Sequence, residues 1–127
     1  MTPDFTPDQR DALIAGRARD GVAAQQRLRA LIRLWQDEPE LKSAARELAL
    51  ADTGSIDTRK LRYPARIPLV LEDGDHDALM AAKYGEGTEA AAVIRALVSI
   101  WLSDSGLEQR VLQVAREQRA AHSRRQH

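Results

Sequence analysis

The chain has 127 residues, of which 43% are hydrophobic, and its 19 basic and 19 acidic side chains give a formal net charge of zero. This length and composition are typical of one compact soluble domain, or of two closely packed halves. The absence of cysteine excludes disulfides, thiolate nucleophiles and cysteine-ligated zinc, and the aromatic content of only 4% favours helices over sheets.

Residues 11–50 resemble residues 77–116 without a gap, at an offset of 66 positions. The match includes the two tryptophans of the chain and a pair of glycines: Trp35 with Trp101, and Gly21 with Gly87. Composition alone does not explain paired tryptophans and glycines, so the repeat predicts a duplicated helical unit.

The first copy is expected to form three helices. Pro7 and Asp8 mark the start of the first helix, which Asp20-Gly21 ends. The second helix ends near Asp37 and has apolar residues at helical spacing: Leu28, Leu31, Ile32 and Trp35. Pro39 then opens a third helix.

A turn-rich linker at 51–57 separates the copies and leads into a basic segment. Residues 59–66 carry four positive charges and no negative one: Arg59, Lys60, Arg62 and Arg66. A strand is expected over 66–72, where Ile67, Leu69 and Leu71 alternate onto one face. Because Pro68 has no N–H to donate, this strand must lie at a sheet edge or in a narrow two-stranded ribbon.

The second copy repeats the helices of the first. A helix from about Asp75 is broken by Gly85-Glu86-Gly87, and Thr88 is expected to be the N-cap of the next helix. A final amphipathic helix follows and ends in a basic tail. The chain is thereby divided into a degenerate repeat at 1–50, a linker and basic arm at 51–65, a second repeat at 66–120 and a mobile tail at 121–127.

The order of strand, helix, glycine-containing turn and longer helix in the second copy resembles the ribbon-helix-helix (MetJ/Arc-like) superfamily of DNA-binding proteins. The segments that carry the resemblance are the strand at 66–71, the helix at 77–84, the turn at 85–89 and the helix at 92–97. The resemblance implies a mainly α fold, a ribbon-helix-helix with one short β-strand at about 66–72 and a helical repeat in both halves.

The resemblance also implies a set of DNA contacts. Two strands would pair into a ribbon that enters the major groove, with Arg66, Pro68 and Val70 facing outward. Thr88 and Glu89 would lie at the helix start that holds a phosphate. The basic arm, Arg59, Lys60 and Arg62, would add phosphate contacts before the strand.

Such a fold needs two copies to bury its apolar faces, so the resemblance implies a homodimer or an intramolecular pseudo-dimer. Projecting the strand back by 66 positions places it on residues 1–5, where Pro3 falls on a core position. The sequence therefore leaves both arrangements open.

The expected function is site-specific binding of double-stranded DNA, as a transcriptional repressor or as a partition or conjugation accessory factor of a plasmid or phage. The alternative is a helical protein–protein interaction module, antitoxin-like or a phage adaptor, which holds a protein partner through its C-terminal helix. Pro68 and Val70 offer no bidentate hydrogen bond to a base, which favours this alternative. Arg or Asp interrupts the longest apolar runs and nothing resembles a signal peptide, so we expect no membrane segment and a cytoplasmic location.

Enzymatic and metal-binding patterns are weak. Asp52-Thr53-Gly54 resembles the active-site triplet of retroviral-type aspartic proteases, but it follows a helical pattern, and no Gly-rich hairpin accompanies it. The acidic residues at 73–77 lack the glycine and the distal glutamate of a calcium loop. We therefore expect no catalytic residues, no metal and no cofactor.

Overall fold

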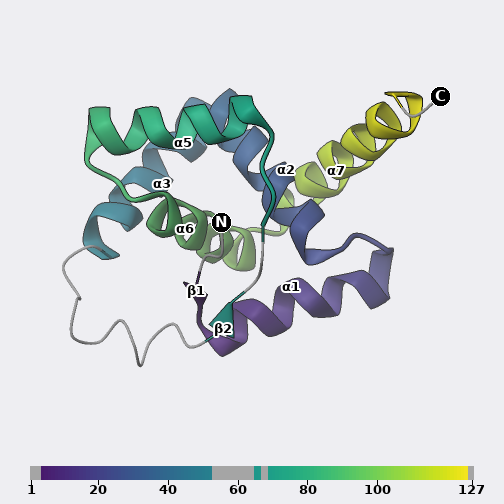
Figure 1. Cartoon of the computed structure of the whole chain (residues 1–127). Helices are drawn as coiled ribbons and strands as arrows, with labels where there is room; N and C mark the ends of the chain where they lie inside the picture. The colour runs from purple at the N-terminus through teal and green to yellow at the C-terminus, as the bar shows by residue number, and fades with distance from the viewer. Residues whose placement is uncertain (1–3, 53–64, 67–68, 126–127) are drawn as a thin grey trace.

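A computed structural model describes residues 4–52, 65–66 and 69–125 of the chain (Figure 1). These residues form six helices and two strands of two residues each. In chain order the elements are β1 (Asp4–Phe5), α1 (Pro7–Asp20), α2 (Ala24–Asp37), α3 (Pro39–Asp52), β2 (Ala65–Arg66), α5 (Asp73–Glu86), α6 (Ala90–Ser103) and α7 (Ser105–Arg125).

The helices repeat at the offset found in the sequence. The starts of α5, α6 and α7 lie 66 positions after those of α1, α2 and α3, and the first two pairs also end 66 positions apart. Only the third pair differs in length, because α3 has 14 residues and α7 has 21. The predicted helices are thus confirmed, including the end of α2 at Asp37 and the start of α3 at Pro39.

Local sequence signals set the bounds of α1. Thr6 and Gln9 form a capping box, in which each side-chain oxygen accepts the backbone N–H of the other residue, at 3.2 and 3.0 Å. Pro7 occupies the first turn, where a missing N–H costs nothing. Gly21 ends α1 and Gly87 ends α5 in the left-handed conformation, with φ of 78° and 74°.

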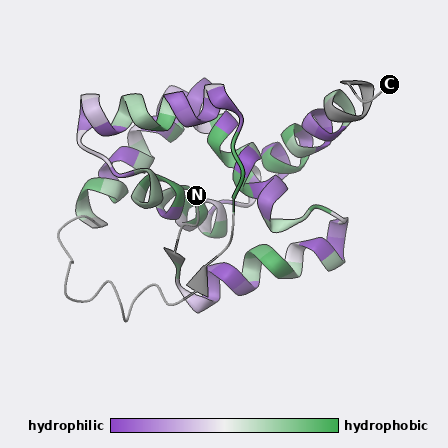
Figure 2. Cartoon of the chain, in the orientation of Figure 1, coloured by the Kyte–Doolittle hydropathy of each residue, from purple (hydrophilic) through white to green (hydrophobic). Residues whose placement is uncertain are grey.

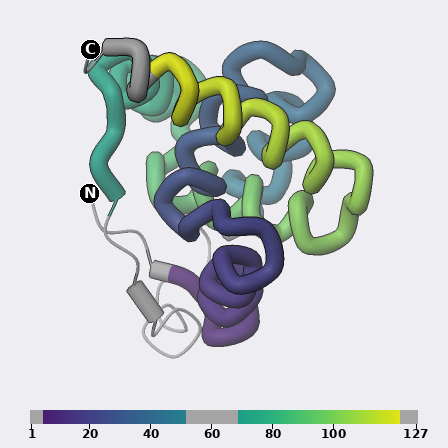
Figure 3. Tube along the Cα trace, turned by 90° about the vertical axis from the view of Figure 1, so that its right-hand side faces the viewer, coloured from purple at the N-terminus to yellow at the C-terminus, as the bar shows by residue number. Residues whose placement is uncertain are grey.

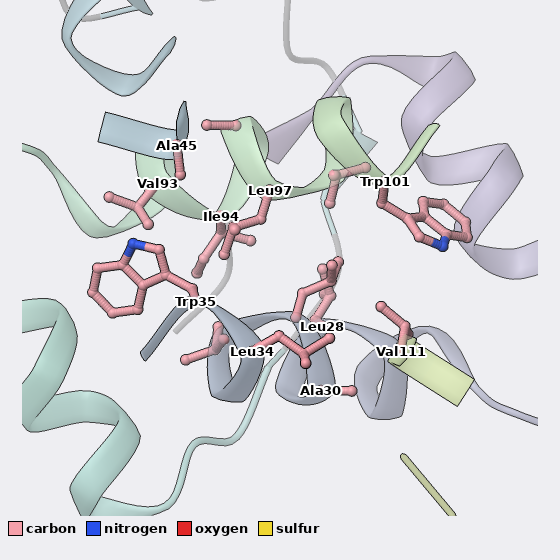
Figure 4. Close-up of a cluster of buried hydrophobic side chains, with 14 of the residues drawn as sticks. Leu28, Ala30, Leu34, Trp35, Ala45, Val93, Ile94, Leu97, Trp101 and Val111 are labelled. Carbon is pink, nitrogen blue, oxygen red and sulfur yellow. The ribbon is translucent and has the colours of Figure 1, made fainter. Parts of the chain in front are cut away.

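The core lies between α2 and α6, which contact each other near the middle of the molecule. In Figure 4 the side chains of Leu28 and Leu34 from α2 face Ile94 and Leu97 from α6. Both tryptophans, Trp35 and Trp101, are buried at this interface or its edge. Hydrophilic residues gather away from it, as at the purple N-terminal end of α5 in Figure 2.

The two copies are crossed over each other. The third helix α3 of the first copy packs on α6 of the second, and α7 packs on α2 (Figures 1 and 3). The first helices contact both copies: α1 packs on α2 and α6, and α5 packs on α6 and α2. Each copy therefore covers the apolar face of the other, and the two share one core.

Equivalent polar contacts join the copies on the two sides of this interface. The Nε2 atom of Gln9 in α1 donates to Oγ of Ser99 in α6 at 3.0 Å. Asp75 and Arg33, the residues 66 positions from Gln9 and Ser99, form an ion pair at 3.5 Å between α5 and α2. The pairing of equivalent positions indicates an approximate twofold relation between the copies.

The strand prediction is wrong. The only strand pairing in the described chain is antiparallel and spans two residues, with Asp4 opposite Arg66 and Phe5 opposite Ala65. Beyond 67–68, which lie outside the described residues, 69–72 have no regular secondary structure and lead into α5 at Asp73. Leu69 is buried and Val70 exposed, so the alternation in the sequence reflects burial along a connection rather than a β-ladder.

The ribbon-helix-helix resemblance, and the fold class taken from it, are wrong for the same reason. That fold depends on a β-ribbon long enough to enter a DNA groove, and a two-residue pairing is too short to form one. Most described residues are instead helical, and the architecture is a bundle of six helices built from two crossed copies.

Within the described ranges, no single helix has the length and apolar character needed to cross a membrane. The pair α6 and α7 passes that test only together, and the two helices are bent by 117° at their junction.

We predict that Gly87→Ala lowers the free energy of unfolding by about 1 kcal/mol, because alanine at positive φ is strained. Gly21→Ala should have the same effect, since its φ is also positive. Gly74→Ala is the matched control: Gly74 lies in α5 with open space around a Cβ. Urea unfolding followed by circular dichroism measures all three, and equal effects at the three positions would contradict the cap assignment.

Candidate functional site

The predicted DNA-contacting residues fall into separate regions of the structure. Arg59, Lys60, Arg62 and Pro68 lie outside the described residues. Arg66 belongs to β2 opposite Asp4, and the side chain of Val70 is 73% exposed. The end of the basic segment is thereby attached to β1, directly before α1.

Thr88 and Glu89 lie directly before α6, at the predicted helix start, but Thr88 is not the N-cap. Thr88 is completely buried, and its hydroxyl donates to the carbonyl oxygen of Ala82 at 3.3 Å, which holds the end of α5. The N-cap of α6 is Glu89, not Thr88 as predicted, and its side chain makes no capping hydrogen bond. The Glu89 carboxylate instead lies 3.7 Å from Nζ of Lys83.

The most unusual polar group in the core is the guanidinium of Arg27, whose side chain has no exposed surface. It donates a hydrogen bond from Nη2 to Asp20 of α1, and its Nη1 lies 3.9 Å from Oε1 of Glu108 in α7. Its Cζ lies 5.5 Å from the ring centroid of Trp101 in α6. We call Arg27, Asp20, Glu108 and Trp101 the Arg27 cluster; it joins four helices.

The lowered pKa of Asp20 shows that its carboxylate compensates the positive charge of Arg27. Burial by itself raises the pKa of this carboxyl. The hydrogen bond from the backbone N–H of Val22, together with the hydrogen bond and positive charge of Arg27, outweighs that effect and holds the pKa below its usual value. Asp20 is therefore ionised at neutral pH and neutralises the buried guanidinium.

Gly16 makes room for the Arg27 cluster. A Cβ at this position would lie 2.5 Å from Cζ and Nε of Arg27, far inside van der Waals contact. Because the guanidinium is enclosed by Asp20 and Trp101, it cannot move aside without breaking the ion pair. The residue 66 positions later is Ala82, so the glycine belongs to the first copy alone.

We predict that Gly16→Ala lowers the free energy of unfolding by about 1–3 kcal/mol, because overpacking outweighs the gain in helix propensity. Gly85→Ala is the control, since Gly85 is also helical and has open space around its Cβ position; this change should stabilise slightly.

The clash also predicts coupling between the two positions. In an Arg27→Met background, the Gly16→Ala change should lose most of its cost. A double-mutant cycle by urea unfolding measures the coupling, and additive effects would show that Gly16 does not act through Arg27.

A second prediction concerns pH. Because the folded pKa of Asp20 is depressed, its contribution to stability is complete above a pH of about 4 and disappears as the pH falls through the folded pKa. Asp20→Asn should therefore destabilise by about 1–3 kcal/mol at neutral pH, and the gap to the unchanged chain should close in acid. Unfolding curves from pH 7 to pH 2 test this, with Asp11→Asn as the exposed control on α1; a gap that stays constant down to pH 2 would refute it.

A groove on the surface lies between α1, the start of α2 and α7. Three arginines line it, with a partly exposed isoleucine and two alanines among the other lining residues: Arg17, Arg29, Arg119, Ile14, Ala23 and Ala24. No carboxylate is among the described residues that line it. We call this surface the arginine groove.

Arg119 is held in place across the arginine groove. Its Nη2 atom donates to the carbonyl oxygen of Gly21 at 2.9 Å and to Oε1 of Gln26 at 3.0 Å. The same Gln26 oxygen accepts the backbone N–H of Ala23, at 2.9 Å. Arg119 is also the first residue of the extension of α7, because Gln118 is equivalent to Asp52, where α3 ends.

Sequence reasoning did not find the Arg27 cluster or the arginine groove, although signals were present. Arg27 shares the apolar face of α2 with Leu31 and Leu34, and a charge at such a position indicates a buried partner. The arginines of the groove lie on three helices, and their assembly follows only from the crossed packing of the copies.

No group of His, Asp or Glu residues in the part of the chain that the structure describes is arranged to hold a metal ion. In the comparisons with known proteins, no family model, no curated protein and no solved structure matches the chain.

Proposed function

We propose that the protein binds double-stranded DNA through phosphate contacts made by Arg59, Lys60, Arg62 and Arg66, as a repressor or as an accessory factor of partition or conjugation. The observation that carries the proposal is the β1–β2 pairing, which ties the end of this basic segment to the start of α1. A basic segment fixed to the body loses less conformational freedom on binding than a free tail does.

The exposed face of α1 extends the basic surface. Arg10 and Arg17 are both exposed and lie seven positions apart, which places them on one side of the helix. At 1.5 Å per residue they are separated by roughly 10 Å along the axis. Val70, exposed on the connection after β2, supplies an apolar group suited to a thymine methyl.

Charge segregation supports the same surface. The acidic residues at the N-terminus of α5 lie at the opposite end of the molecule from α1 and the strand pair (Figures 1 and 3). Several other carboxylates are occupied by arginines, as in the pairs Asp20–Arg27 and Glu38–Arg110. A net charge of zero is therefore compatible with one basic face.

In the alternative function, a protein–protein interaction module holds its partner through the C-terminal helix, but apolar residues of that helix are already covered. Leu107 and Val111 of α7 are completely buried, and α7 packs on α2 of the same chain. Their replacement would disrupt the core rather than reveal a partner.

We predict that replacing Arg59, Lys60 and Arg62 by alanine weakens binding to 20–30 base-pair duplexes about tenfold or more at 0.1 M salt. The salt dependence of the binding constant should fall by about one unit of slope for each phosphate contact removed. Fluorescence anisotropy with duplexes from a genomic fragment library, from 0.05 to 0.3 M salt, measures both quantities.

The control is a variant with the same change in charge, Arg46→Ala, Lys83→Ala and Arg116→Ala, made on α3, α5 and α7. Its binding should be close to that of the unchanged chain. No binding to any duplex at 0.05 M salt, or equal losses in the two triple variants, would refute the proposal.

A further inference from the structure

The arginine groove exists because the two copies differ. In the first copy, the equivalent of α7 is α3, which ends at Asp52. The residue of α7 equivalent to Asp52 is Gln118, so the crossed packing requires α7 only up to Gln118. The chain continues the helix to Arg125, and the first added residue, Arg119, contacts the turn between α1 and α2. The extension thus adds a wall to a surface groove without being required by the repeat.

All charged residues that line the groove itself are arginines; two of them, Arg29 and Arg119, also line an adjoining pocket that contains Glu72 and Asp75. Arg17, Arg29 and Arg119 come from α1, α2 and α7, and no carboxylate lines the groove within the described part of the chain. Hydrogen bonds to Gly21 and Gln26 hold Arg119 in place, so its guanidinium is ordered before any ligand arrives. Three arginines that line one groove favour an occupant with carboxylates or phosphates.

An apolar group accompanies these charges. The side chain of Ile14 is 45% exposed and lines the groove beside Ala23 and Ala24. A phosphate backbone has nothing to place against such a surface, whereas a peptide can offer an apolar side chain between acidic ones.

We propose that the arginine groove binds a short acidic segment of a partner protein, with an apolar side chain against Ile14 and carboxylates paired with Arg17, Arg29 and Arg119. The partner is thus recognised by charge and by one apolar anchor. Of the residues proposed to contact DNA, only Arg17 also lines the groove.

A random library of 12-residue peptides, displayed on phage and selected against the intact chain, tests the proposal. The enriched sequences should carry Asp or Glu on both sides of Leu, Ile, Met or Phe. Chemical synthesis of the best peptide then allows its affinity to be measured by anisotropy and its binding surface to be mapped from backbone amide shifts. The largest shifts are expected at Ile14 and at residues 23–26.

Two variants test the contributions separately. Arg17→Gln combined with Arg119→Gln should weaken the peptide at least tenfold, and Ile14→Ser should weaken it several-fold. Arg46→Gln combined with Arg116→Gln is the control with the same change in charge; it should leave the affinity unchanged. Circular dichroism and the unfolding midpoint confirm that each variant is folded.

Four results would overturn the proposal: no enriched peptides, enriched peptides without acidic residues, shifts that map away from the groove, or equal losses in the two double variants. A 20 base-pair duplex that displaces the peptide and shifts the same amides would assign the groove to DNA instead. The DNA proposal is tested with the variant at Arg59, Lys60 and Arg62, and the peptide proposal with variants of the groove. Either proposal can therefore fail while the other is still tested.

Discussion

The crossing of the two copies is the constraint on which the rest of the structure depends. Neither α2 nor α6 is covered by the third helix of its own copy alone; α7 packs on α2 and α3 packs on α6. A three-helix unit of this kind would leave one face of its central helix in water, at a cost of roughly 25 cal/mol for each Å² of apolar surface. The exchange of outer helices removes that surface from both copies at once and makes one core of two similar halves.

The Arg27 cluster shows how far the copies have diverged within this shared core. Val93 is equivalent to Arg27, and Ala82 is equivalent to Gly16, so the second copy has buried apolar residues at the positions of the arginine and the glycine. A buried ion pair contributes little net stability compared with well-packed apolar groups, but removing one partner leaves a costly unpaired charge. We therefore regard the cluster as a device that fixes the relative positions of four helices rather than as a source of stability.

Much of the helical structure could be predicted from the sequence, because its causes are local. Pro7, Gly21, Pro39 and Gly87 mark helix ends through the conformational limits of single residues, and the offset of 66 transfers these marks from one copy to the other. The lack of a strand at 69–72 could not be predicted, because alternation of apolar residues is shared by a β-strand and by an extended connection that covers a core. Only pairing partners distinguish the two, and within the described residues no strand pairing extends to 69–72. The site escaped prediction for a related reason: Arg17, Arg29 and Arg119 are brought together by packing between the copies, which no local pattern encodes.

The crossed arrangement also has a consequence for how the chain folds as it is synthesised. When α1, α2 and α3 leave the ribosome, the helices that must cover α2 and α3 have not yet been made. The first half therefore keeps apolar surface exposed until α6 and α7 follow, and the contacts that close the core join residues far apart in sequence. Such topologies fold more slowly than bundles in which neighbouring helices pack first. Duplication thus doubled the length of a small unit and also made the fate of the first copy depend on completion of the second.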